Sequence, residues 1–137
     1  MNSITDIEKS ISEEFEMFDT WMEKYEYIID LGKQLDSFPE DWKVEGNLVH
    51  GCQSKVWFKT AHKEGLFVCH AISDSAIVSG LIALLLRIYN DKTPIDIVQA
   101  EPRFIGMIGL NEHLSPTRNN GLNVMIQRIK QDAASML

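Results

Sequence analysis

The 137-residue sequence has little cysteine, a deficit of basic charge and no long apolar run, and each shortage argues against a class of protein. Two cysteines, Cys52 and Cys69, allow one disulfide and no disulfide framework. Thirteen basic against 20 acidic residues give a net charge of −7, whereas nonspecific nucleic-acid binding needs basic patches. The longest apolar run, 76–88, contains Arg87 and falls short of the ~20 residues that span a bilayer.

What the chain does contain is typical of a globular protein. Apolar residues make up 45% of the sequence and charged residues 24%, which suffices for a core. The length suits one compact domain over residues 1–137. The start is polar and acidic and does not resemble a secretory signal peptide. We therefore expect a cytoplasmic protein with reduced thiols and, given its acidity, a basic protein partner.

Helical periodicity dominates the first 40 residues. Apolar residues three and four positions apart predict a helix over 4–18, with Glu8, Glu13, Glu14 and Glu16 on its solvated face. Thr20 is a predicted N-cap for a second helix that continues toward Leu35. Pro39 ends that helix, because proline disfavours helix at the residue before it.

The period then changes to that of strands. Residues 47–50, 55–61 and 66–72 are predicted strands, and 63–65 is a hairpin turn. The connections are too short for crossover helices, so the sequence predicts a small three-stranded antiparallel sheet packed against helices, an α+β fold.

Helices return after residue 73. The capping cluster 73–75 precedes a helix over 76–89 that is apolar nearly all round and is therefore predicted to be the buried centre, with Gly80 allowing a close neighbour. Thr93-Pro94 and Ser115-Pro116 each predict a helix start with a cap followed by proline. Residues 104–110 predict a further short helix.

Cys52 lies in a small polar turn between the first two predicted strands. The thiolate is the nucleophilic form of cysteine, and His50 and Lys55 bring positive charge close in sequence. Gly51 allows backbone angles that other residues avoid, while Gln53 and Ser54 are polar. Free cysteines are also often buried packing residues, so the residues alone leave both interpretations of Cys52 open.

Other chemistry is only weakly indicated. Cys69 lies within a strand pattern and is interpreted as a packing residue. The paired ligand spacing of a structural zinc site is missing, and no metal is predicted. His113 could pair with Cys52 as in cysteine proteases, although no third orienting residue stands out. Arg118 lies in the first turn of the helix predicted to start at Ser115-Pro116, where the helix dipole disfavours a positive charge. Its position is consistent with a partner contact, an ion pair or a solvated side chain.

Four blocks of sequence, in order, resemble the SufE family of sulfur acceptor proteins. The blocks are WMEKYEYIIDLG (21–32), GCQSKVW (51–57), SDSAIVSGLI (73–82) and HLSPTR (113–118). The second block is the most specific, and the four together extend over nearly the whole chain.

The resemblance implies a SufE/IscU-like fold and a function. Cys52 would accept sulfane sulfur as a persulfide from a pyridoxal-phosphate-dependent, SufS-like cysteine desulfurase, stimulate that enzyme and pass sulfur to an iron–sulfur scaffold. The chain would be a sulfur carrier with no cofactor of its own, as a monomer or homodimer. Gly51, Gln53 and Ser54 would shape the cysteine loop. Asp74, His113 and Arg118 would support the loop or dock the partner.

Two alternatives from other classes stay open. An IscU-like scaffold would hold a cluster with three cysteines, but Ser73-Asp74-Ser75 stands where that family places a ligand cysteine. A regulatory binding module for a desulfurase would need no thiol at all. One hypothesis concerns the thiol itself: if the start of helix 76–89 lies near Cys52, its dipole would lower the thiol pKa.

Overall fold

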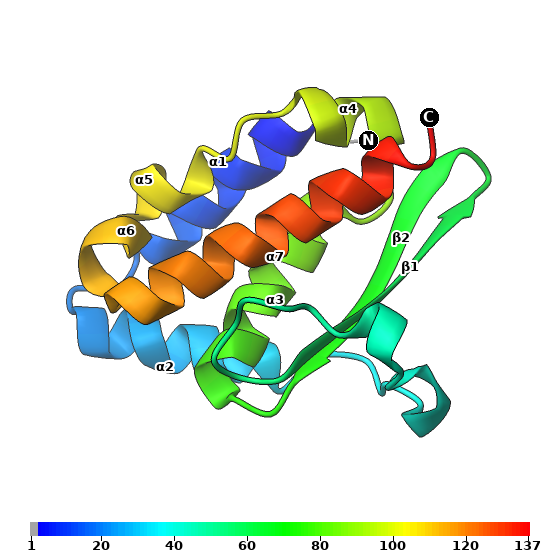
Figure 1. Cartoon of the computed structure of the whole chain (residues 1–137). Helices are drawn as coiled ribbons and strands as arrows, with labels where there is room; N and C mark the ends of the chain where they lie inside the picture. The colour runs from blue at the N-terminus through cyan, green and yellow to red at the C-terminus, as the bar shows by residue number, and fades with distance from the viewer. Residues whose placement is uncertain (1–2) are drawn as a thin grey trace.

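The computed structural model describes residues 3–137, and within that range helices pack on one antiparallel hairpin (Figure 1). In chain order the elements are α1 (Ile4–Phe15), α2 (Trp21–Gly32), the 3-10 turns η1 (Glu40–Trp42) and η2 (Glu45–Asn47), β1 (Val56–Lys63), β2 (Leu66–Ser73), α3 (Ala76–Tyr89), α4 (Pro94–Gln99), α5 (Phe104–Ile108), α6 (Leu110–His113) and α7 (Pro116–Ala134). The predicted α+β class is confirmed.

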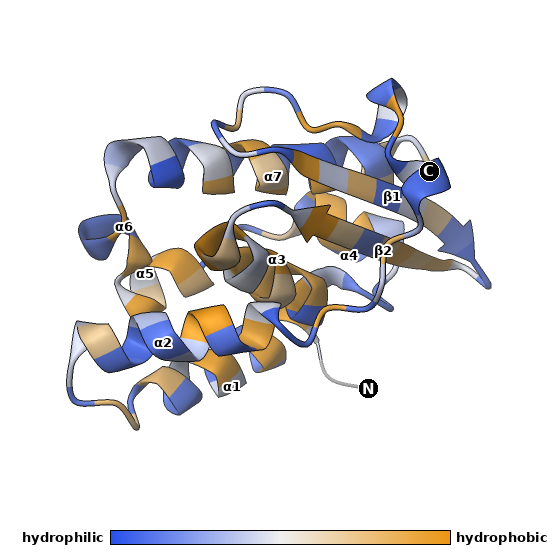
Figure 2. Ribbon diagram, turned by 90° about the horizontal axis from the view of Figure 1, so that it is seen from below, coloured by the Kyte–Doolittle hydropathy of each residue, from blue (hydrophilic) through white to orange (hydrophobic). Residues whose placement is uncertain are grey.

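The centre of the fold is α3, as its all-round apolar character predicted. It contacts α1, α2, α7 and β2, and its residues Ile82, Leu85 and Ile88 are fully buried. Figure 2 shows the hydrophobic turns of α3 enclosed between the neighbouring helices and the hairpin. Ser75 caps the helix by accepting a hydrogen bond from the backbone N–H of Val78 at 3.3 Å.

The crossing of α2 and α3 requires glycine. A Cβ atom built on Gly80 would lie 2.1 Å from the carbonyl oxygen of Ile28, which no side chain could tolerate without a shift of the backbone. The predicted close approach at Gly80 is therefore confirmed. It sets the position of the start of α3, which lines the cavity described below.

The sheet has two strands, and the predicted third strand over 47–50 is wrong. β1 and β2 pair from Val56 opposite Ser73 to Lys63 opposite Leu66. Segment 47–50 contributes one isolated bridge, between Leu48 and Trp57. Pairing goes no further because Asn47 belongs to the 3-10 turn η2 and because Gly51 turns the chain with a φ of +96°.

The outer edge of β2 is covered by residues that follow α3. The Asn90 side chain accepts the N–H of Cys69 at 2.7 Å and donates to the Cys69 carbonyl at 3.1 Å. The carbonyl of Lys92 accepts from the Phe67 N–H at 2.8 Å, and the Asp91 N–H donates to the Phe67 carbonyl at 2.9 Å. Side chain and backbone together thus act as a partial third strand.

The face of α1 differs from the prediction at two glutamates. Glu8 is 2% exposed, because its carboxylate accepts the backbone N–H groups of Arg103 and Phe104, both at 2.8 Å. Glu14 is partly exposed, pairs with Arg87 of α3 and accepts the Tyr27 hydroxyl. The other two predicted surface glutamates are exposed. These contacts hold α1 against α3 and against the start of α5.

The predicted helix starts are confirmed at Thr20, Thr93 and Ser115, whose side chains each accept a backbone N–H three residues on. The second helix ends at Gly32, before Leu35. Within residues 3–137, none of the helices is both long and apolar enough to cross a bilayer.

Candidate functional site

The Cys52 turn is a short loop closed at its base by backbone hydrogen bonds. Just outside the turn, the Val49 N–H donates to the Val56 carbonyl at 2.8 Å. Gly51 has a φ of +96°, and a Cβ atom there would lie 3.3 Å from the Val124 side chain of α7. Both the backbone angle and the space therefore favour glycine beside the cysteine.

Asp74 closes the other side of the loop base. Its carboxylate accepts the backbone N–H of Lys55 at 3.1 Å, and its own N–H donates to the Lys55 carbonyl at 3.3 Å. Asp74 is exposed, and its backbone belongs to the segment that leads from β2 into α3. The loop is thus fixed to the same segment that positions the start of α3.

The thiol of Cys52 lies against the first turns of α7. Its Sγ atom is 3.7 Å from the Gly121 carbonyl, and the neighbouring Gly51 carbonyl accepts from Asn120 Nδ2 at 3.3 Å. A cavity of about 250 Å³ adjoins the thiol. It is lined by Cys52, Gln53 and Ser54 of the loop, by Val78 and Leu81 of α3, and by Ser115, Thr117, Arg118, Gly121, Leu122 and Met125 of α7.

Burial raises the pKa of the Cys52 thiol. Val78, in the first turn of α3, lines the cavity, so the helix start does lie near Cys52. In this resting conformation burial acts in the opposite direction, because removal from water favours the neutral thiol, and the lowering of the thiol pKa by the helix dipole stays a prediction. His50 is not free to favour the thiolate, since its Nε2 atom pairs with Glu45 at 3.0 Å.

The structure brings some predicted site residues together and separates another. Gln53, Ser54 and Arg118 share the cavity with Cys52. His113 does not line it: its ring stacks on Trp21 with centroids 3.9 Å apart, and its Nδ1 atom lies 3.0 Å from the Gly109 carbonyl. A Cys52–His113 pair as in cysteine proteases is therefore not formed.

Several cavity residues were missed by sequence reasoning. Ser115 was predicted only as a cap, and Gly121, Leu122 and Met125 only as parts of the last helix or not at all. Together with Arg118 they recur at helical spacing, which marks one face of α7. That spacing could have identified these residues if the packing of α7 against Cys52 had been known. The local sequence does not reveal that packing.

Cys69 occupies a different environment. It is 2% exposed within β2, and burial is the main cause of its strongly raised pKa. Its Sγ atom lies 3.6 Å from the His70 carbonyl. Among residues 3–137, no three His, Cys, Asp or Glu side chains gather in a way that could hold a metal ion.

The fold and the sequence both match known proteins. A hypothetical protein from Thermus thermophilus, whose solution structure is known, superposes with a TM-score of 0.77 at 19% identity, over 94% of each chain. At that identity the likeness concerns the fold. The family model of SufE, described as an Fe-S metabolism associated domain, matches residues 9–133. This match includes the Cys52 loop, its anchor at Asp74 and the start of α7. The chain therefore belongs to the SufE family, whose domain is associated with iron–sulfur metabolism.

Proposed function

We propose that this chain is a sulfur carrier that accepts sulfane sulfur on Cys52 from a cysteine desulfurase and delivers it to an iron–sulfur scaffold protein. The observation that carries the proposal is the Cys52 thiol itself, which lies in a cavity at the tip of a short loop with an anchored base. Membership of the SufE family supports the same chemistry. The desulfurase holds the pyridoxal phosphate, and this chain contributes the thiol.

The transfer step is a thiol exchange that needs no external oxidant. The Cys52 thiolate attacks the terminal sulfur of a persulfide on the desulfurase cysteine. A new S–S bond forms on Cys52, the S–S bond of the donor breaks, and the donor cysteine leaves as a thiolate. Removing the persulfide product in this way frees the desulfurase for another turnover, which accounts for stimulation of the enzyme.

Both the cavity and the raised pKa suit a carrier that waits for its partner. The neutral, partly buried thiol is a poor nucleophile at rest and is protected from oxidation. Opening has to break the contacts of Cys52 with Gly121 and of Gly51 with Asn120, each worth about 1 kcal/mol or less. Gly51 serves as the hinge of this movement.

The remaining predicted residues have separate roles in this proposal. Gln53 and Ser54 accompany Cys52 when the loop opens, while Asp74 keeps the loop base closed. Arg118 is exposed at the rim of the cavity, where it is available to an acidic group of the partner. The His113 ring stacks on Trp21 and holds α6 against α2. It contributes to docking only by keeping the surface that α2 and α6 form together in place.

The test is intact-mass analysis after incubation with a cysteine desulfurase and cysteine. The native chain and a Cys69→Ala control should each gain about 32 Da, one sulfur atom, in a form that reductant removes. Cys52→Ser should gain nothing. A native chain that gains no sulfur, or a Cys52→Ser variant that still gains it, would contradict the proposal.

Desulfurase stimulation separates the carrier from a thiol-independent binding module. A carrier requires Cys52, so Cys52→Ser should bind the desulfurase without raising its turnover. Full stimulation by Cys52→Ser would instead identify a binding module. Reconstitution of the chain alone with iron and sulfide tests the scaffold alternative, and a stable cluster would favour it.

A further inference from the structure

Arg128 of α7 reaches across to the segment that precedes the Cys52 loop. Its Nη2 atom donates to the Gly46 carbonyl at 2.7 Å, and its Nη1 atom donates to the Leu48 carbonyl at 3.3 Å. Gly46 lies in η2, a single 3-10 turn without a side-chain cap. One guanidinium therefore fastens to a long helix two backbone carbonyls of a segment whose other ordered features are one 3-10 turn and the single Leu48–Trp57 bridge.

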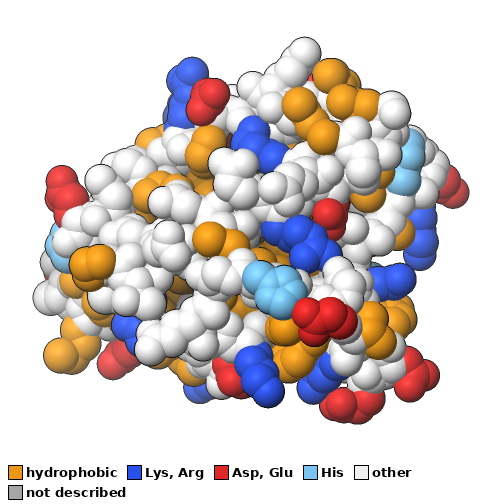
Figure 3. All heavy atoms as spheres, in the orientation of Figure 1, with side chains coloured by type: hydrophobic (Ala, Val, Ile, Leu, Met, Phe, Trp, Pro, Cys, Tyr) orange, Lys and Arg blue, Asp and Glu red, His pale blue; other side chains and the backbone are white. Residues whose placement is uncertain are grey.

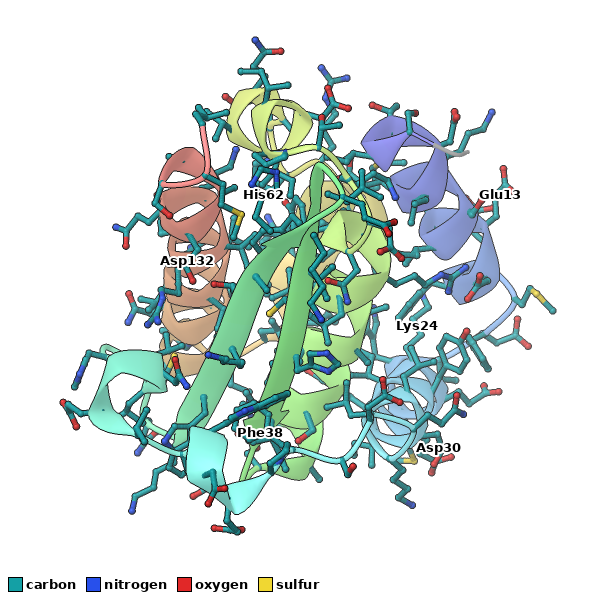
Figure 4. The ribbon with its side chains drawn as sticks, turned by 90° about the vertical axis from the view of Figure 1, so that its right-hand side faces the viewer. Glu13, Lys24, Asp30, Phe38, His62 and Asp132 are labelled. Carbon is teal, nitrogen blue, oxygen red and sulfur yellow. The ribbon has the colours of Figure 1, made fainter. Side chains whose placement is uncertain are left out.

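Asp132 holds the guanidinium in place one helical turn further on. Arg128 Nε lies 3.2 Å from each carboxylate oxygen of Asp132, and the Thr60 hydroxyl of β1 donates to the same carboxylate at 2.9 Å. Figure 4 shows Asp132 on α7 beside the hairpin. The Arg128 and Asp132 side chains are each 21% exposed, so water screens this pair less than a fully exposed one.

The loop has anchors of different kinds on its two sides. Upstream, Arg128 holds segment 46–48 on α7. Downstream, Asp74 holds Lys55 beside the start of α3. Between these anchors, beyond the Val49–Val56 hydrogen bond, lie residues 50–54, which include the hinge Gly51 and the thiol of Cys52. Figure 3 shows the face crossed by α7, where acidic and basic side chains are interspersed.

We infer that Arg128 is a positioning residue, which keeps segment 46–48 on α7 so that opening of the Cys52 loop is confined to residues 50–54. The anchor restricts the movement to a short stretch and returns the thiol to the same cavity. Its relevance to sulfur transfer rests on the proposed function, whereas its effect on the loop can be measured without a desulfurase.

The experiment compares iodoacetamide alkylation of the two cysteines in the same molecule, resolved by peptide mass mapping. In Arg128→Gln, loss of two charged hydrogen bonds should raise the Cys52 rate about tenfold. The Cys69 rate should not rise, because exposing that thiol requires the pairing of β1 with β2 to open, and Arg128 makes no hydrogen bond to either strand. Burial and the neighbouring Asp132 carboxylate both raise the Cys69 pKa, and Arg128 only opposes them, so loss of the Arg128 charge does not increase the thiolate fraction of Cys69.

Lys130 provides a matched control on the same helix. Its ammonium group also binds backbone carbonyls, those of Ile97, Val98 and Ala100 at the end of α4. Lys130→Gln should leave the ratio of the Cys52 and Cys69 rates within about twofold of the native ratio. If Arg128→Gln does not fold, Arg128→Lys serves instead, since it keeps the charge and the aliphatic stem but loses the planar fork.

The outcomes separate a local anchor from a general stabilising role. A rise at Cys52 alone supports the inference. A parallel rise at both cysteines, or no rise at Cys52, overturns it. If the alkylation ratio changes as expected but no persulfide forms with a desulfurase, the anchor stands and the proposed function fails. If persulfide forms while the ratio is unchanged, the anchor fails and the function stands.

Discussion

Cys52 is partly buried and Cys69 is buried, and exposing each thiol requires a different change in the molecule. Cys69 faces the core from β2, and its backbone N–H and carbonyl are held by Asn90. Cys52 is held by its contact with Gly121 and by the closed conformation of a short loop. Burial raises both pKa values, so the resting pKa does not distinguish them. The difference is that Cys52 can leave its cavity without separation of the strands.

The largest expected effect is the contrast in reactivity itself. Exposure of Cys69 requires the sheet to open, which takes a large part of the global unfolding free energy, whereas exposure of Cys52 requires local opening. Cys52 should therefore react with iodoacetamide about a thousandfold faster than Cys69, or more, under native conditions. Peptide mapping over a time course measures both rates. Similar rates would mean that the loop and the sheet open together.

Gly80→Ala should reduce the ratio of the Cys52 rate to the Cys69 rate, because it destabilises the core. The added Cβ would meet the Ile28 carbonyl at the α2–α3 crossing, and such overpacking costs about 3 kcal/mol. Urea unfolding should show this loss, and the Cys69 rate should rise by a larger factor than the Cys52 rate, because Cys69 is exposed only when the core opens. Gly106→Ala is the control, because a Cβ there has no neighbour within 4 Å. Equal stability losses for both variants would contradict the crossing argument.

Gly51→Ala should increase the ratio of the Cys52 rate to the Cys69 rate, because it destabilises the closed loop. Alanine is strained at a φ of +96° and would press on Val124, which disfavours the closed conformation by about 1–2 kcal/mol. The Cys52 alkylation rate should rise about tenfold with little change at Cys69. Gly65→Ala introduces similar strain at the hairpin turn, where φ is +81° and a Cβ meets nothing. A selective Cys52 effect in that control would argue against a local hinge.

The smallest effect is on the pH dependence of stability. A raised pKa keeps the folded thiol protonated after the unfolded thiol ionises, near pH 8.5, so stability should fall as pH rises above about 8.5. Cys69 should account for about 1 kcal/mol per pH unit of this fall. Urea unfolding with reductant at several pH values should show a shallower slope for Cys69→Ala than for the native chain. Identical slopes would mean that Cys69 is not buried as described.

Local signals made much of the fold predictable. The bounds of α3 and the starts of α4 and α7 follow from residues adjacent in sequence, namely a cap with an apolar run or a cap with proline. The third strand was wrong because alternation alone does not reveal that η2 and Gly51 limit Leu48 to one bridge. Glu8 was placed in solvent because its partners, the N–H groups that begin α5, lie 95 and 96 residues away.

The candidate site was predictable to the extent that one sequence block contains it. Cys52, Gln53 and Ser54 are consecutive in the second block, and Arg118 came from the fourth block. The contributions of α7 beyond Arg118 depend on how that helix packs, which periodicity cannot give. Asn120 and Arg128 are polar residues on a helix, and nothing in the local sequence distinguishes them from surface residues until the loop is seen against them.

The cover that Asn90 provides over β2 has a consequence for the behaviour of many copies together. A two-stranded sheet has two outer edges, and an exposed edge is a template on which another chain can add a strand and begin to aggregate. The Asn90 amide occupies the outward N–H and carbonyl of Cys69, and Asp91 and Lys92 occupy those of Phe67. These four backbone groups therefore cannot pair with a strand of another chain. The outer edge of β2 is thus protected from aggregation at high protein concentration.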